Sequence, residues 1–272
     1  MSAPTRVMDA RIRERRRTVA QERARRRRRR VASVVTAVLV AGGAYALTYT
    51  PLFAVTEVTV EGVTGDRAEA VRSVAGVVPG QRLLDVDLDG VAAAVEDLAW
   101  VRATEVTRQP PSTVVLAVAV RTPVAVLRTA DQAWLVDADG VLVAGGDAAD
   151  LLEIYAPDTV LPGAGAVVRD PTVRTALDVH ARLAGPLRAG VVRYEAHGQH
   201  GVRMLLDGRL IADDADDLWV RVGSAERVDA KARVIGLLIE QLRAGSGRVG
   251  EQAVAELDVR VPDNPVLVPA SE

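Results

Sequence analysis

Residues 53–62 read FAVTEVTVEG, and this stretch begins the folded part of the chain. Its side chains alternate in polarity with a period of two, so that Val58 and Val60 lie on one face and Glu57 and Thr59 lie on the other. Such alternation is typical of a β-strand. The sequence therefore predicts that the fold opens with a strand over these residues.

Two short helices are predicted after this strand. Asp66 and Glu69 have the spacing of a capping box, which predicts a helix that runs to about Ala75 and stops at Gly76. The second helix has Asp87 as its N-cap. Its apolar stripe has members spaced by four, three, four and three residues: Leu84, Leu88, Val91, Val95 and Leu98. Helices this short are not stable alone, so both must pack on a small sheet.

The sheet is completed by two further strands, predicted over residues 101–108 and 114–121 and joined by Pro110-Pro111-Ser112-Thr113. The predicted order of elements is thus strand, helix, helix, strand, strand.

Upstream of the first strand, residues 31–56 contain no charged side chain. A helix over residues 31–49 would be roughly 28 Å long, close to the thickness of the hydrocarbon layer of a bilayer. We predict a membrane-spanning helix at residues 31–50. A cleavable signal peptide is the alternative, because Ala44-Tyr45-Ala46 resembles a cleavage site, although the apolar run continues past it. The folded part is exported in either case.

Residues 1–30 carry 13 arginines and three acidic residues. Six arginines are consecutive: Arg25, Arg26, Arg27, Arg28, Arg29 and Arg30. Basic flanks are retained on the cytoplasmic side, so they predict that the N-terminus is inside and that the rest lies outside. The tail is also expected to contact anionic lipid. We do not expect nucleic acid as a partner, because no aromatic or recognition motif accompanies these arginines.

The exported part has the composition of a folded protein. The whole chain is 49% hydrophobic, and residues 31–272 hold 21 basic and 33 acidic side chains, a net charge of −12. Cysteine is absent, so neither disulfides nor thiolate metal ligands support the fold. Packing of apolar side chains must stabilise it.

The second half of the chain predicts a β-rich domain. Residues 133–136 and 141–144 flank the turn sequence Asp137-Ala138-Asp139-Gly140 and predict a hairpin. A helix is predicted from Asp170-Pro171 to about residue 187, and another over residues 225–244. Further strands are predicted over residues 191–196, 202–206, 209–212, 218–222, 254–261 and 266–268.

Taken in order, these residues resemble a known family. The pattern comprises Phe53 to Gly62, then Gly80-x-x-Leu83 with Val86-Asp87, Leu98-Ala-Trp-Val101, Val106-x-Arg-x-Pro110 and Val120-Arg-Thr-Pro-Val124. It is similar to the POTRA domain of the FtsQ/DivIB family of bacterial cell-division proteins. The resemblance implies an α+β fold with a basic tail (1–30), a transmembrane helix (31–50), a POTRA domain of β-α-α-β-β order (51–122), a mixed or antiparallel β domain with two longer helices (123–269) and a short tail (270–272).

The resemblance also implies a function. Proteins of this family act as non-catalytic scaffolds of the divisome at the septum, and they bind the small membrane proteins FtsB and FtsL. The chain would then be a single-pass membrane protein without a cofactor, a metal ion or a small-molecule substrate. Two alternatives stay open: another POTRA adaptor of envelope assembly or export, and a membrane-anchored wall enzyme. No catalytic constellation is recognisable for the latter.

In the resembling family a partner adds a strand beside the last strands of the β domain. In this sequence that implies a partner site at Arg260, Val261, Val266, Leu267 and Val268, with Arg260 pairing an acidic residue of the partner. Pro265 and Pro269 cannot donate to a ladder, which independently predicts a sheet edge here. Proteobacterial members carry aromatic residues at this tip where this chain has aliphatic ones.

Some polar residues form patterns outside this scheme. Asp85-Val-Asp87-Leu-Asp89-Gly90 followed by Glu96 matches a calcium-binding EF-hand loop, but Pro79-Gly80 occupies the place of the entering helix, so we do not expect calcium. His180 is expected to be hydrogen-bonded in a core, and His197 and His200 to lie in a turn. Lys231, the single lysine, is expected to pair with a carboxylate or to extend to solvent.

Overall fold

The computed structural model describes residues 30–43, 45–46, 49–198, 201–245, 248–249 and 252–269. Arg25–Arg29 of the basic run, His200 and the predicted tail at 270–272 lie outside the described residues. Residues 30–43 and 45–46 are helical. Within the described ranges, no helix combines the length and the apolar character needed to cross a bilayer. The anchor at residues 31–50 therefore stays a prediction.

The chain divides into two compact units. The first contains the residues up to Glu61 together with Asp66–Val91 and Val106–Leu116, and the second contains Gly62–Gly65, Ala92–Glu105 and the residues from Ala117 onward.

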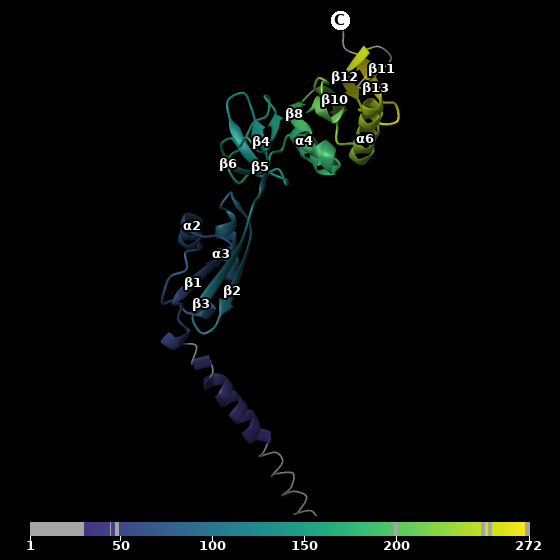
Figure 1. Cartoon of the computed structure of the whole chain (residues 1–272). Helices are drawn as coiled ribbons and strands as arrows, with labels where there is room; N and C mark the ends of the chain where they lie inside the picture. The colour runs from purple at the N-terminus through teal and green to yellow at the C-terminus, as the bar shows by residue number, and fades with distance from the viewer. Residues whose placement is uncertain are drawn as a thin grey trace, which may run out of the picture. The chain divides into compact units, whose positions relative to one another are not determined.

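A three-stranded sheet of order β1-β3-β2 carries two helices (Figure 1). The order of elements confirms the predicted strand, helix, helix, strand, strand arrangement. The elements are η1 (Pro51–Phe53), β1 (Glu57–Glu61), α2 (Asp66–Ala75), η2 (Leu83–Asp85), α3 (Leu88–Glu96), β2 (Val101–Gln109) and β3 (Thr113–Val120).

The start of α3 shows how one aspartate fixes a helix end. Asp87 precedes the helix, and its carboxylate accepts a hydrogen bond of 3.1 Å from the backbone N–H of Gly90, as predicted for an N-cap. Glu96, the last residue of the EF-hand pattern, instead accepts from the N–H of Thr104. Because α3 begins inside the supposed calcium loop, these carboxylates serve the helix and the adjoining strand. The predicted stripe is corrected at one position, since Leu83 is buried where Leu84 was expected.

Replacing Asp87 with alanine is expected to lower the free energy of unfolding by about 1 kcal/mol, because the first turn of α3 loses its cap. Thermal or urea unfolding of the purified chain measures the change. Asp89→Ala is the matched control, since Asp89 is an exposed acid in the same turn. Equal effects of the two substitutions would contradict a capping role. Calcium should not alter either result.

The second sheet is a ten-stranded mixed sheet, which agrees with the predicted α+β class. Its strand order is β11-β12-β10-β9-β8-β7-β4-β5-β6, with β13 pairing β12. The strands are β4 (Pro123–Arg128), β5 (Ala133–Asp137), β6 (Leu142–Gly145), β7 (Leu152–Tyr155), β8 (Val191–His197), β9 (Gly201–Leu206), β10 (Leu218–Gly223), β11 (Arg248–Val249), β12 (Gln252–Asp258) and β13 (Val266–Pro269). The helices are α4 (Pro171–Arg182), α5 (Gly185–Ala189), η3 (Gly208–Leu210) and α6 (Val228–Ala244).

Two predicted elements of this region were wrong. The helix expected to run to residue 187 ends at Arg182, and α5 follows, because Pro186 has no N–H to donate and its ring would clash with the preceding turn. The strand expected over residues 209–212 is instead the turn η3. There the Asp207 carboxylate accepts from the N–H of Arg209 and caps the turn.

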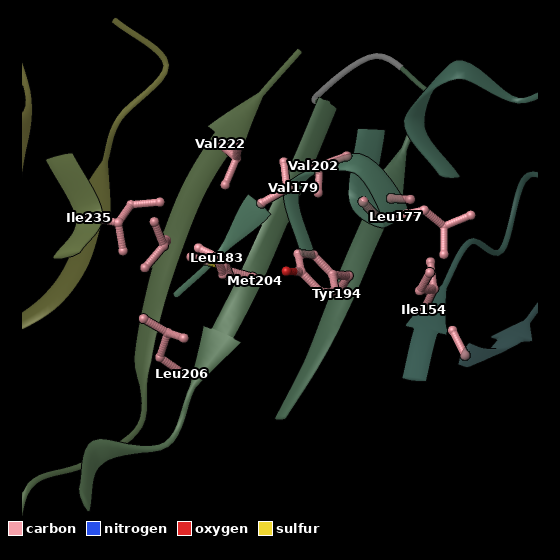
Figure 2. Packing of buried hydrophobic residues seen from close by; sticks show 14 of the residues in the cluster. Ile154, Leu177, Val179, Leu183, Tyr194, Val202, Met204, Leu206, Val222 and Ile235 are labelled. Carbon is pink, nitrogen blue, oxygen red and sulfur yellow. The ribbon is translucent and has the colours of Figure 1, made fainter. Parts of the chain in front are cut away.

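Helix α4 lies beside β8, β9 and α6 and covers the core of the second sheet (Figure 1). Tyr194 on β8 is fully buried there, and Figure 2 shows its ring close to Leu183 and Met204. Burial raises the pKa of the Tyr194 phenol. His180 on α4 meets this ring edge-on, with the centroids 5.9 Å apart. Burial lowers the pKa of His180, which fits its predicted place at a core.

Candidate functional site

The two ends of the ten-stranded sheet differ in how their outer backbone groups are used. At one end, the segment that follows β7 closes over β6. Leu142 donates to the carbonyl of Ala166 at 3.0 Å, and Gly165 donates back to the carbonyl of Leu142 at 2.8 Å. An isolated bridge between Val141 and Val167 continues this contact. The β6 edge is therefore occupied by the chain itself.

At the other end, β12 pairs with both β11 and β13. Among the strands of the described residues, β13 pairs with β12 alone, in an antiparallel register that places Val266 opposite Asp258 and Val268 opposite Glu256. The edge predicted from Pro265 and Pro269 is confirmed. A strand with one neighbour presents backbone N–H and C=O groups to a second chain.

The side chains of this edge divide into two sets. Val266 and Val268 are 48% and 40% exposed, whereas Leu267 between them packs against the core. This follows from the period of two along a strand. Arg260 and Val261 are exposed in the turn that joins β12 to β13. The structure thus brings all five sequence-predicted residues to one end of the sheet.

Arg260 already has an acidic neighbour within the chain. Its Nε lies 2.9 Å from one Asp258 oxygen, and an Nη donates to the same oxygen at 2.6 Å. The Arg260 hydrogen bond lowers the pKa of Asp258. The aliphatic part of Arg260 rests on Gly223, where an added Cβ would approach Arg260 Cγ to 2.9 Å. Pairing of Arg260 with a partner's acid stays a prediction.

The β12–β13 turn is fastened to the turn between β10 and α6. Asp263 accepts two hydrogen bonds from the Arg227 guanidinium, at 2.5 and 2.8 Å. Val259 donates to the carbonyl of Arg221 at 2.9 Å. The Arg227 hydrogen bond also lowers the pKa of Asp263. The Arg227–Asp263 pair thus joins the β12–β13 turn to the start of α6, and the Val259 bond joins the end of β12 to β10.

Lys231 contacts the turn between β10 and α6, and the prediction made for its environment was wrong. The residue is 3% exposed, so it does not extend to solvent. Within the part of the chain that the structure describes, its Nζ forms no ion pair with a carboxylate and donates instead to the carbonyls of Val222 at 2.9 Å and Ser224 at 2.8 Å. Burial lowers the pKa of its ammonium. Lys231 thus fixes the turn that carries Arg227.

Sequence reasoning did not predict the ion pairs at this end of the sheet, which join Asp258 to Arg260 and Asp263 to Arg227. One signal was present, since Asp258 and Arg260 are two residues apart and would lie on the same face of an extended chain. The pairing of Arg227 with Asp263 spans 36 residues and has no local signal.

The described residues contain no group of three or more histidine, cysteine or acidic side chains that could hold a metal ion. His197 lies at the end of β8, with its Nε2 3.6 Å from Glu195, rather than in the predicted turn. The same carboxylate pairs with Arg193 and Arg203.

Comparisons with known proteins agree with the fold. A family model described as "POTRA domain, FtsQ-type" matches residues 53–119. "Cell division protein FtsQ" of Mycolicibacterium smegmatis is 32% identical over 210 residues, which are 77% of this chain and 59% of that protein. The same-named protein of Mycobacteroides abscessus is 32% identical over 76% of this chain and 63% of its own length. The protein of the same name from Mycobacterium tuberculosis strain H37Rv is 30% identical over 77% of this chain and 62% of its own length.

The chain therefore spans about three fifths of the length of the curated relatives it matches.

Proposed function

This chain belongs to the FtsQ family, whose matching relatives are cell-division proteins, and from that premise we propose that it is a non-catalytic scaffold of the divisome. It binds FtsB- and FtsL-type proteins and thereby links early and late components of the division machinery at the septum. The open edge at β13 is the observation that supports this proposal most directly.

The contrast between the two sheet ends is the physical reason for choosing β13. An exposed edge strand invites pairing with other chains, and proteins normally cover or charge such edges. Here β6 is covered by residues 165–168, whereas β13 carries exposed valines. An incoming extended segment would gain backbone hydrogen bonds along β13 and would bury Val266 and Val268. Arg260 and Val261 complete this surface.

The character of these side chains also supports a binding role over a catalytic one. The edge offers apolar groups together with carboxylates that are already in ion pairs, namely Asp258 with Arg260 and Asp263 with Arg227. Paired carboxylates are poor proton donors and acceptors near neutral pH, because the cation stabilises the ionised form. The surface is suited to hold a polypeptide.

The proposed topology follows the charge pattern of the N-terminus. Residues 1–30 stay in the cytoplasm and contact anionic lipid, residues 31–50 cross the cell membrane, and the exported part comprises a POTRA domain at 51–122 and a β domain at 123–269, with 270–272 as a short tail. The arginine run supports this orientation.

We expect the double substitution Val266→Ser and Val268→Ser to weaken binding of the cognate FtsB-type protein by about tenfold or more, because two apolar contacts are lost. The measurement is a titration of full-length chain in lipid nanodiscs by biolayer interferometry. Serine is chosen over an acidic residue because a glutamate opposite Asp258 would weaken β13 itself.

Val160→Ser is the matched control, since Val160 is 89% exposed in a loop of the same unit. It should leave the affinity unchanged. Equal affinities of the double variant and the native chain would place the partner site elsewhere and refute the β13 edge. Absence of any binding by the native chain would contradict the scaffold proposal.

A further inference from the structure

The first unit exposes apolar side chains close to the end of the uncharged N-terminal run. Outside the helical residues 30–43, the large exposed apolar residues of this unit are Tyr45, Tyr49, Leu52, Val74, Val78 and Leu84. Because residues 31–56 carry no charge, the candidate occupant is the lipid of the bilayer itself.

Two segments of this unit are joined just where those residues occur. Val55 donates to the carbonyl of Gln81 at 2.8 Å, and Gly80 donates back to the carbonyl of Val55, also at 2.8 Å. A bridge between Ala54 and Arg82 extends the pairing. The loop at residues 78–84 is thereby held against the chain that leaves the N-terminal helix.

A cation sits over the aromatic residues at this junction. The Arg82 guanidinium lies 3.8 Å from the centroid of the Tyr49 ring. Tyr49 in turn meets Tyr45 edge-on at 5.4 Å, with their hydroxyl groups 3.0 Å apart. Tyrosines at the end of an apolar run are typical of the interface between lipid and water. A stacked arginine beside them is suited to bind phosphate oxygens.

We propose that residues 78–84 form a second contact of the chain with the membrane, in which Arg82 binds phospholipid phosphate and Val78 and Leu84 enter the headgroup layer. The inference rests on the proposed anchor at residues 31–50. Its consequence is that the three-stranded unit is held against the outer surface of the membrane and does not swing on a free tether.

The charge balance around the loop indicates which force dominates. Asp85 lies 3.7 Å from the Arg82 Nε, and Asp87 and Asp89 follow closely in sequence. Because several carboxylates lie near one cation, the loop as a whole would not be attracted to an anionic surface. Insertion of apolar side chains must therefore provide most of the binding, with Arg82 fixing the orientation.

The test uses the absence of cysteine from the chain, since a single introduced cysteine takes one nitroxide label. Full-length Val78→Cys is reconstituted in nanodiscs of phosphatidylethanolamine and phosphatidylglycerol. Accessibility of the label to oxygen and to a water-soluble nickel complex is then measured by power saturation. Glu69→Cys, on the exposed side of α2, is the water-facing control.

We expect the label at position 78 to favour oxygen and the label at 69 to favour nickel. Adding Arg82→Glu, or in a separate sample Leu52→Ser, should raise the nickel accessibility at 78 toward that at 69. A label at 78 that is as water-accessible as that at 69 in the native background overturns the inference. If the label at 78 is water-accessible but the protein stays on the discs, the loop contact is refuted and the anchor stands. If the protein elutes free of the discs, both the anchor and the loop contact are contradicted.

Discussion

Lys231→Ala is expected to lower the free energy of unfolding by about 3 kcal/mol, since it removes a buried aliphatic stem and leaves one buried and one partly buried carbonyl without this donor. Those carbonyls belong to Val222 and Ser224, next to the turn that carries Arg227. Urea unfolding followed by tryptophan fluorescence measures the loss. Arg233→Ala is the control, because Arg233 is exposed on the same helix and should change the stability little.

Lys231→Met separates packing from hydrogen bonding at this position. Methionine keeps most of the stem, so the loss should fall to about 1 kcal/mol, which reflects the two carbonyls alone. A loss as large as that of alanine would mean that the hydrogen bonds outweigh the packing. No loss with either residue would show that the turn holds without Lys231.

The lowered pKa of Lys231 also makes a prediction about pH. Because burial disfavours the ammonium, the unfolded chain binds more protons than the folded chain between the lowered pKa and the ordinary value of 10.5. Stability contributed by this group should therefore rise as the pH rises through that window. Lys231→Met should remove this rise when native and variant chains are compared at the same pH. Identical pH profiles would contradict a buried ammonium at this site.

The same mutation tests the connection between stability and binding at β13. Lys231 lies far in sequence from Val266, yet it supports the turn whose Arg227 holds Asp263 in the β12–β13 connection. A variant that is folded but has lost this support should bind a partner more weakly without any change in the edge side chains. Such a result would identify Lys231 as a positioning residue.

Local patterns were sufficient to predict much of the first sheet. The period of two in β1, the Asp87 cap and the glycine after α2 are each written within a few residues of the element they define. The edge at β13 followed in the same way from Pro265 and Pro269, whereas the α+β class was implied by the family resemblance. In these cases the deciding interactions are between near neighbours.

Most of the errors concern interactions that leave no local pattern in the sequence. Strands β4 and β7 were not predicted. The short strand β7 pairs in parallel with β4 and β8, which are distant in sequence, so no turn signal joins it to a neighbour. Strand β4 also pairs antiparallel with β5, but the connecting residues 129–132 contain neither glycine nor proline to mark a turn. The partners of Lys231 are backbone carbonyls, which no side-chain pattern reveals. The break between α4 and α5 was readable from Pro186, and it was missed because the apolar spacing continues across it.

Asp137 is the clearest example of a predicted turn residue with a larger role. The sequence predicted the turn between β5 and β6, and the structure adds that the Asp137 side chain is only 6% exposed and pairs with the Arg121 guanidinium at 2.7 Å. Its other oxygen accepts from the N–H groups of Asp139 at 3.0 Å and Val141 at 2.8 Å. Arg121 also donates to the carbonyl of Val101. One carboxylate therefore joins a turn to an arginine 16 residues before it.

Asp137→Ala is expected to lower the free energy of unfolding by about 3 kcal/mol, because it leaves a largely buried guanidinium without its counter-charge and two amides without an acceptor. Asp137→Asn should lose about half as much, since an amide oxygen can still accept from both N–H groups. Asp139→Ala, at an exposed acid of the same turn, should change the stability by no more than about 0.5 kcal/mol.

The order of these three losses decides what the buried pair contributes. If asparagine is as damaging as alanine, the attraction to Arg121 dominates, and adding Arg121→Met to Asp137→Asn should recover part of the loss by removing the unpaired cation. If asparagine is nearly neutral, the two backbone amides dominate, and the arginine is held in place mainly by the Val101 carbonyl. Either order is compatible with the turn, but only the first makes Arg121 and Asp137 one energetic unit.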